Sequence, residues 1–281
     1  MCSSWQVATS RNGIACTAMG DVFRYGFLAD AVWAGTLVAI MAGATGTLLV
    51  LRGQSFAGHA LGHVGFTGAA AALLLGVPPL AGLVAATVAA GIAIGALGTR
   101  AEERDVAIGL VLSVALGAGL LCLSLLNGPA SQATALLFGN ILGVDPAILG
   151  ALAALAAITL TALAVIARPL VFATLQPELA EAQGVPVRLL SILFLGVAAL
   201  TVAACVQIVG ALLVFALLVA PAATAQRVCT RLAPATMLAI ALAIGQVWGS
   251  ILLAALTDWP VSFWVTTLGG AAYAAASISR P

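Results

Sequence analysis

The stretch QSFAGHALGH, residues 54–63, holds both histidines of the chain and lies between two long apolar runs. His59 and His63 are four residues apart, so a helix would place both imidazoles on one face, one turn apart. The apolar runs on either side put such a helix in or at a membrane. An imidazole pair is costly to bury in lipid and well suited to a divalent metal ion. The two residues are therefore candidate metal ligands, with hydrogen-bonded core histidines as the alternative.

The composition around this stretch excludes a soluble protein. Of the 281 residues, 63% are hydrophobic and only 7% are charged, whereas about a quarter of the residues in a soluble domain are charged. The basic residues are ten arginines, and the net charge of +1 gives no indication of a nucleic-acid partner. The five cysteines show no CxxC spacing, so they indicate neither a zinc cluster nor a disulfide framework.

Apolar runs follow one another along the chain, and several reach the roughly 20 residues needed to cross a bilayer. They predict an all-α polytopic membrane protein with nine spans, or with eight, because no charge separates the sixth run from the seventh. Residues 131–143 are too short to span and are expected to form a short surface helix. The predicted spans are residues 31–51, 57–75, 80–98, 107–125, 147–167, 189–205, 209–225, 234–256 and 260–278.

Two regions complete the predicted domain organisation. Residues 1–30 form a mixed N-terminal tail, and Met19 is as good a candidate for the start of the protein as Met1. Residues 31–281 are expected to form a single transmembrane domain.

Eight of the ten arginines fall on one side of the membrane if nine spans alternate from an outside N-terminus. Cytoplasmic loops of membrane proteins carry an excess of arginine. The N-terminus is therefore predicted outside the cell and the C-terminus in the cytoplasm, with Arg11 and Arg24 of the tail as exceptions. The eight residues are Arg52, Arg100, Arg104, Arg168, Arg188, Arg227, Arg231 and Arg280.

The longest break on the arginine-rich side is RPLVFATLQPELAEAQGVPVR, residues 168–188. Within it, Pro177 is expected to begin a short amphipathic helix and Gly184 to end it. A short cytoplasmic helix across the base of a bundle is a docking surface; an ordinary solvated loop is the alternative. In the seventh span, Pro221 is expected to kink the helix near its cytoplasmic end.

Five stretches, taken in order, resemble the permease subunits of metal-ion ABC importers, the zinc, manganese and iron branch. The likeness covers the chain from about Phe23, and the fold of this branch is similar to that of the vitamin B12 and siderophore permeases. The stretches are LRGQSFAGHALGHVGFTGA (51–69), DVAIGLVLS (105–113), LLFGNILGV (136–144), FATLQPELAEAQGVPV (172–187) and VGALLVFALLVAPAATA (209–225).

The resemblance implies partners as well as a fold. In such permeases the stretch matching residues 177–186 is the coupling helix that fits a groove on the ATPase, which implies a coupling role for Pro177, Glu178, Glu181 and Gly184. The chain has no GxxxxGK[ST] motif, so ATP hydrolysis is expected on a separate cytoplasmic subunit and this chain is not expected to be an enzyme. An extracellular metal-binding lipoprotein and a second permease protomer, most simply in a homodimer, are the other expected partners. The chain itself is expected to be a multi-pass protein of the plasma membrane.

The family's usual pattern in the second span is Gly-Asp, with a His four residues after the Asp. Here His63 matches the family His, whereas Gly58-His59 stands in place of Gly-Asp. Carboxylate plus imidazole suits manganese or zinc, and two imidazoles favour zinc or another late first-row ion. The expected cargo is therefore zinc, with manganese or iron next.

The expected function is the permease of an ATP-driven divalent-metal importer that works by alternating access. A siderophore or cobalamin permease is an alternative, which the short chain and the histidine pair disfavour. A second alternative is an autonomous secondary transporter or channel. That class predicts acidic residues in mid-span, and here Asp and Glu are confined to span ends and loops.

Overall fold

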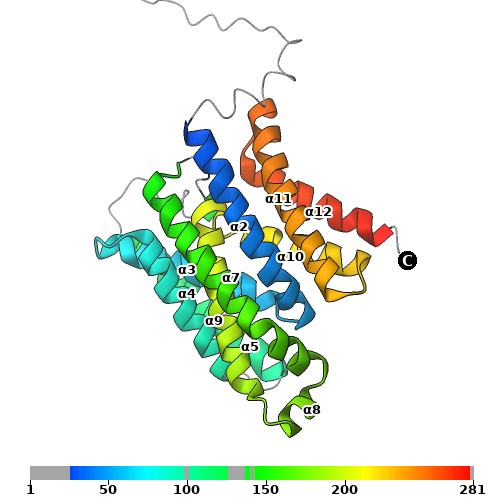
Figure 1. Ribbon diagram of the computed structural model, residues 1–281. Coiled ribbons are helices and arrows are strands. Elements are labelled where there is room, and N and C mark those ends of the chain that lie inside the picture. Colours follow the sequence, from blue (N-terminus) through cyan, green and yellow to red (C-terminus); the bar gives the residue numbers. More distant parts are fainter. Residues whose placement is uncertain (1–25, 98–100, 126–136, 140, 142, 279–281) are drawn as a thin grey trace, which may run out of the picture.

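The computed structural model describes residues 26–97, 101–125, 137–139, 141 and 143–278. Within these ranges the protein has nine long helices, one short helix and no strand (Figure 1). The tail up to residue 25 and most of the short helix expected over residues 131–143 lie outside the described residues. The helices are α2 (Gly26–Leu51), α3 (Ser55–Leu74), α4 (Pro79–Leu97), α5 (Ala101–Leu125), α7 (Pro146–Leu175), α8 (Pro177–Ala182), α9 (Val187–Val209), α10 (Val214–Val228), α11 (Leu232–Thr257) and α12 (Val261–Ile278).

Each of the nine predicted spans falls on one of the nine long helices, which confirms the all-α polytopic fold. Seven of them are long and apolar enough to cross a membrane. The other two are α3, whose 20 residues include two histidines and four glycines, and α10, which has only 15 residues. A helix of 15 residues is about 22 Å long, shorter than the hydrocarbon core of a bilayer.

The largest error in a predicted boundary lies at the end of the fifth span. The fifth helix does not end at residue 167 but continues through Arg168 and Pro169 to Leu175, so only residues 176–186 connect α7 and α9 as anything other than long helix. A charge marks the edge of an apolar run without ending the backbone hydrogen bonding. Between α9 and α10, Gly210 adopts φ +92° and ends α9 at Val209. Two helices therefore form without a charged break.

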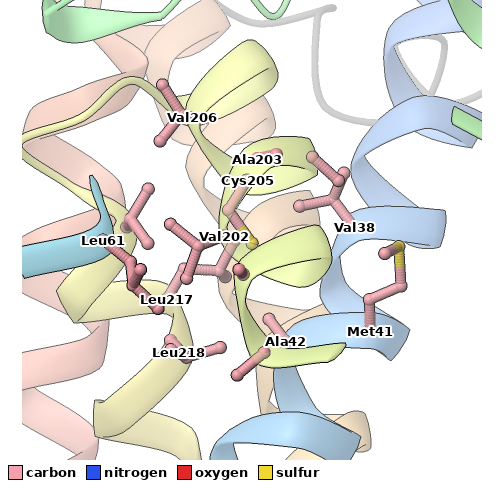
Figure 2. Packing of buried hydrophobic residues seen from close by; sticks show 14 of the residues in the cluster. Val38, Met41, Ala42, Leu61, Val202, Ala203, Cys205, Val206, Leu217 and Leu218 are labelled. Carbon is pink, nitrogen blue, oxygen red and sulfur yellow. The ribbon is translucent and has the colours of Figure 1, made fainter. Parts of the chain in front are cut away.

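Helices α2 and α9 form the centre of the bundle. In each, 72% of the apolar window is buried, against 17% in α5 and 11% in α12 at the periphery. Thr45 of α2 and Thr201 of α9, both buried, share a hydroxyl–hydroxyl hydrogen bond of 2.8 Å. Figure 2 shows the apolar contacts around this pair of helices; it labels Val38, Met41, Ala42, Leu61, Val202, Ala203, Cys205, Val206, Leu217 and Leu218.

Glycines at helical spacing bring α4 against α9. A Cβ on Gly91 would lie 2.6 Å from the carbonyl oxygen of Leu195, and a Cβ on Gly95 would lie 2.8 Å from the Cα of Ile192. The two backbones therefore approach as small-residue motifs allow in membrane helices. By contrast, a Cβ on Gly245 would meet nothing within 4 Å, and a Cβ on Gly249 would meet only the end of the Leu268 side chain, at 3.1 Å. Among the described residues, the same spacing on α11 therefore brings no second backbone close.

Candidate functional site

His59 and His63 lie on α3, which begins at Ser55 after Gln54 at its N-cap position. Their imidazole rings meet edge to face, with 4.8 Å between the ring centroids and 87° between the ring planes. The four-residue spacing thus places both rings on one face of the helix, as the sequence predicted. Both side chains are partly exposed in the single chain, so a ligand can reach them.

Two phenylalanines flank His59. The ring of Phe56 on the same helix lies 6.0 Å from the His59 ring, and that of Phe215 on α10 lies 5.6 Å away, nearly perpendicular to it. Both phenylalanines are exposed, Phe56 by 48% and Phe215 by 40%. The histidines therefore open onto an aromatic face that the other described residues leave uncovered. No local pattern in the sequence indicates Phe215, because α10 reaches α3 only in the folded bundle.

Glycines on α3 allow this approach of α10. A Cβ on Gly58 would lie 2.9 Å from the side chain of Leu218, and a Cβ on Gly62 would lie 3.2 Å from the carbonyl oxygen of Ala211. The GxxxG spacing at these two positions holds α3 against α10 and the turn before it. The histidine that follows each glycine is thereby set beside the seam between the two helices, where Phe215 contacts His59.

The imidazoles are the candidate metal ligands on α3. The described part of the chain adds no third His, Cys, Asp or Glu that could complete a metal-binding cluster. Nδ1 of His63 is buried and has no hydrogen-bond partner among the described residues, so no hydrogen bond of the described chain competes for its lone pair. Two ligands leave a tetrahedral ion two positions short. The remaining positions fall to water, backbone carbonyls or a second chain.

The predicted docking segment forms α8, with Pro177 in its first turn. After its last residue, Gly184 adopts φ +78°. The N–H of Gly184 donates to the carbonyl of Glu181, and that of Val185 donates to the carbonyl of Ala180, each at 2.9 Å. This pair of bonds around a left-handed glycine is the Schellman motif that ends many helices. The predicted start and stop of the short helix are both confirmed.

The surface of α8 is acidic and largely free. Glu178 and Glu181 are exposed, Leu179 is 46% exposed, and Ala180 is fully buried and anchors the helix. The helix packs on α7 and α9 and projects from the lower end of the bundle in Figure 1. Two carboxylates and a leucine are thus presented to whatever lies beyond that end. Their role in docking stays a prediction.

Pro221 lies inside α10 and is buried. Because proline has no N–H, the carbonyl of Leu217 loses the donor that it would have in a regular helix. A Cβ on Gly46 of α2 would collide with the carbonyl oxygen of Leu218, so the two backbones touch next to this position. The kink itself remains a prediction.

Two polar residues before α3 look from the sequence like part of a loop, yet both are embedded in the protein. Gln54 is only 3% exposed, and neither amide atom of its side chain has a hydrogen-bond partner among the described residues. Arg52 is partly buried and donates hydrogen bonds to Thr174 and Ser191. From their polarity alone, both residues would be assigned to a solvated loop. Only the contacts with distant helices show that they are part of the packed structure.

Comparison with known proteins gives concordant results. The model of the ABC 3 transport family matches residues 24–279. The chain is 30% identical over 213 residues to the manganese transport system membrane protein MntC of Halalkalibacterium halodurans, covering 75% of this chain and 73% of that protein. It is 33% identical over 228 residues to the chelated iron transport system membrane protein YfeC of Yersinia pestis, covering 80% and 76%.

A solved structure resembles the whole bundle. A chain of PsaBC from Streptococcus pneumoniae, in complex with Fab, matches with a TM-score of 0.83 and 24% sequence identity. The match covers 93% of this chain and 94% of that chain. At this level of identity the likeness establishes the fold.

Proposed function

Because the chain belongs to the ABC 3 transport family, we propose that it is the membrane-spanning permease subunit of an ATP-binding-cassette importer for a divalent transition-metal ion. The observation that carries the proposal is the pair of imidazoles on α3, 4.8 Å apart and open to one face, within a chain that matches the family over residues 24–279. The curated relatives are named for manganese and chelated iron transport.

Two observations bear on the ion. The relatives' names favour manganese or iron, whereas the ligands on α3 are two neutral imidazoles. Imidazole nitrogen suits zinc and other late first-row ions, and carboxylate oxygen suits manganese. We therefore propose that zinc is preferred, with manganese and iron next, and that His59 is the residue that sets this preference.

The open face of α3 supports a second protomer. Two imidazoles facing hydrocarbon would be costly, so ionisable groups of membrane helices almost always face the bundle interior or a water-filled cavity. Within one chain, α3 leaves His59 and His63 partly exposed beside exposed Phe56 and Phe215. A second copy of this chain would cover that face and could supply the ligands that the described part of one chain lacks. The metal pathway then runs between the two protomers.

Transport needs partners on both sides of the membrane. We propose that a cytoplasmic ABC ATPase binds the acidic surface of α8 and that an extracellular metal-binding lipoprotein delivers the ion. Nine spans with an outside N-terminus put α8 and most arginines on the cytoplasmic side. Movement of α8 when the ATPase closes would then open the pathway alternately to the two sides. An ion held by few protein ligands can leave again, which transport requires.

The proposal is tested with purified components in proteoliposomes. Permease, ATPase and lipoprotein together should take up radioactive zinc in an ATP-dependent manner, and omission of any one of them should abolish uptake. The permease alone should not hydrolyse ATP. ATP hydrolysis by the permease alone, or zinc uptake driven by an ion gradient without the ATPase, would overturn the proposal and favour an autonomous transporter.

Replacing His59 with aspartate should shift selectivity toward manganese. The substitution exchanges an imidazole for a carboxylate at the position that sets the preference, while His63 stays. We expect the ratio of manganese to zinc uptake to rise about tenfold, which corresponds to about 1.4 kcal/mol. Competition between the two ions in proteoliposomes measures this ratio. Leu74→Ala, at the far end of the same helix, should leave it unchanged; an unchanged ratio in His59→Asp would remove His59 from the selectivity site.

A further inference from the structure

Arg52, in the turn between α2 and α3, holds together both ends of the connection that carries α8. Its Nη1 donates to Oγ1 of Thr174 at 2.8 Å, and its Nη2 donates to Oγ of Ser191 at 2.7 Å. Thr174 is the last residue but one of α7, and Ser191 is in the first turns of α9. One side chain thus bridges the two helices between which α8 is suspended.

The surroundings of the guanidinium are built to hold it. Ser191 is 6% exposed and Phe194 is fully buried; the Arg52 Cζ lies 5.5 Å from the centre of the Phe194 ring. Thr174 donates its own hydroxyl hydrogen to the carbonyl of Leu170 at 2.6 Å, which leaves its oxygen to accept from Arg52. A planar guanidinium presents donors in two fixed directions and stacks on an aromatic ring, and a lysine ammonium cannot do both.

The turn that carries Arg52 is short and hydrogen-bonded to the end of α2. The N–H of Gly53 donates to Val50 at 3.0 Å, and that of Gln54 donates to Leu49 at 2.9 Å. The side chain of Gln54 is buried directly before α3 begins at Ser55. Because the turn is short and hydrogen-bonded, a displacement of the guanidinium would also move the start of α3. His59 lies one turn further along this helix.

We propose that Arg52 is a positioning residue that couples the docking helix α8 to the histidine-bearing helix α3. When α8 is displaced, the ends of α7 and α9 move with it and carry the guanidinium through Thr174 and Ser191. The turn then transmits the movement to α3 and so to the imidazole pair. This inference rests on the proposed function, because it concerns the coupling of ATP hydrolysis to metal movement.

The test measures metal ions transported per ATP hydrolysed by the complete transporter in proteoliposomes. Arg52→Lys keeps the charge but loses the two-way bridge, and we expect the ratio to fall roughly fivefold or more, the lower end of typical coupling between sites. Thr174→Ala removes one acceptor and should lower the ratio in the same direction. Thr174→Ser keeps the hydroxyl and should retain the wild-type ratio.

Arg227→Lys is the matched control. Arg227 on α10 also combines a hydrogen bond with an aromatic contact, since its Nη2 donates to the Tyr273 hydroxyl at 2.9 Å and its Cζ lies 4.8 Å from that ring. It links α10 to α12 rather than to the ends of α7 and α9, so its replacement should leave the ratio unchanged.

The outcomes separate the inference from the function on which it rests. Wild-type ratios in both Arg52→Lys and Thr174→Ala would overturn the role of Arg52 while zinc uptake by the wild-type complex still upheld the transporter. If Arg52→Lys does not fold, the comparison of Thr174→Ala with Thr174→Ser decides: equal ratios of transported metal to hydrolysed ATP in these two variants would overturn the role of Arg52. A wild-type complex that moves no metal would overturn the proposed function, and the inference with it.

Discussion

Replacing His63 with alanine should lower metal uptake about 100-fold while the permease still folds and binds its ATPase. Its Nδ1 is buried without a hydrogen-bond partner among the described residues, so the substitution breaks no hydrogen bond of the fold through that atom. Loss of a residue that merely supports a metal ligand costs about 10–100-fold in metal affinity. Loss of a ligand itself should cost more than loss of its support. We therefore expect uptake to fall by at least about 100-fold, the upper end of this range.

Uptake of zinc, manganese and iron is measured for the His63→Ala transporter in proteoliposomes, together with its thermal unfolding midpoint. Leu74→Ala is the control, because it shortens an exposed side chain at the last residue of α3, away from the histidines; its uptake should match the wild type. Undiminished uptake of all three ions by His63→Ala would show that the histidine pair is not on the metal path. A lowered unfolding midpoint would instead assign His63 a structural role.

The parts of the fold that follow from local pattern were predictable from the sequence. Long apolar runs identify membrane helices because few alternatives satisfy the backbone in lipid. The same holds for α8, since Pro177 and Gly184 act within a single turn of the chain. At His59 and His63, helical periodicity alone predicted that the two imidazoles lie on one face, where their rings are in contact.

The remaining features depend on contacts between distant segments, which no local pattern encodes. In the sequence, Arg52 looks like an ordinary charged loop residue. Its hydrogen-bond partners, Thr174 and Ser191, lie far along the chain on α7 and α9. In the sequence, Phe215 is one apolar residue of a span among many. It contacts His59 only because the glycines of α3 allow α10 to approach closely. For the same reason the GxxxG spacings look alike in the sequence, although some of these glycines contact another helix in this chain and Gly245 does not.

The contact between α3 and α4 yields the largest expected effect on stability. A Cβ on Gly68 would collide with the carbonyl oxygen of Gly82 and lie 2.5 Å from the Cβ of Ala86. In return, a Cβ on Gly82 would collide with the carbonyl oxygen of Gly68. The obstacles are backbone atoms and a short side chain, which cannot move aside as the end of a long side chain could.

Gly68→Val should therefore push α3 and α4 apart. Overpacking typically costs about 1–3 kcal/mol, and the upper end, about 3 kcal/mol, is expected here because two backbones meet. Thermal unfolding of the purified permease measures the loss. Metal uptake should fall as well, because α3 also carries the histidines and its other face is fixed against α10 by Gly58 and Gly62.

Gly150→Val on α7 is the matched control for this substitution. A Cβ at Gly150 would meet nothing within 4 Å, and the residue is exposed. Valine is no worse than glycine for the helix itself, so this variant should unfold at the wild-type temperature. If Gly68→Val also did so, α3 and α4 would not meet at these glycines. The position of α3 would then depend on its contacts with α5, α9 and α10.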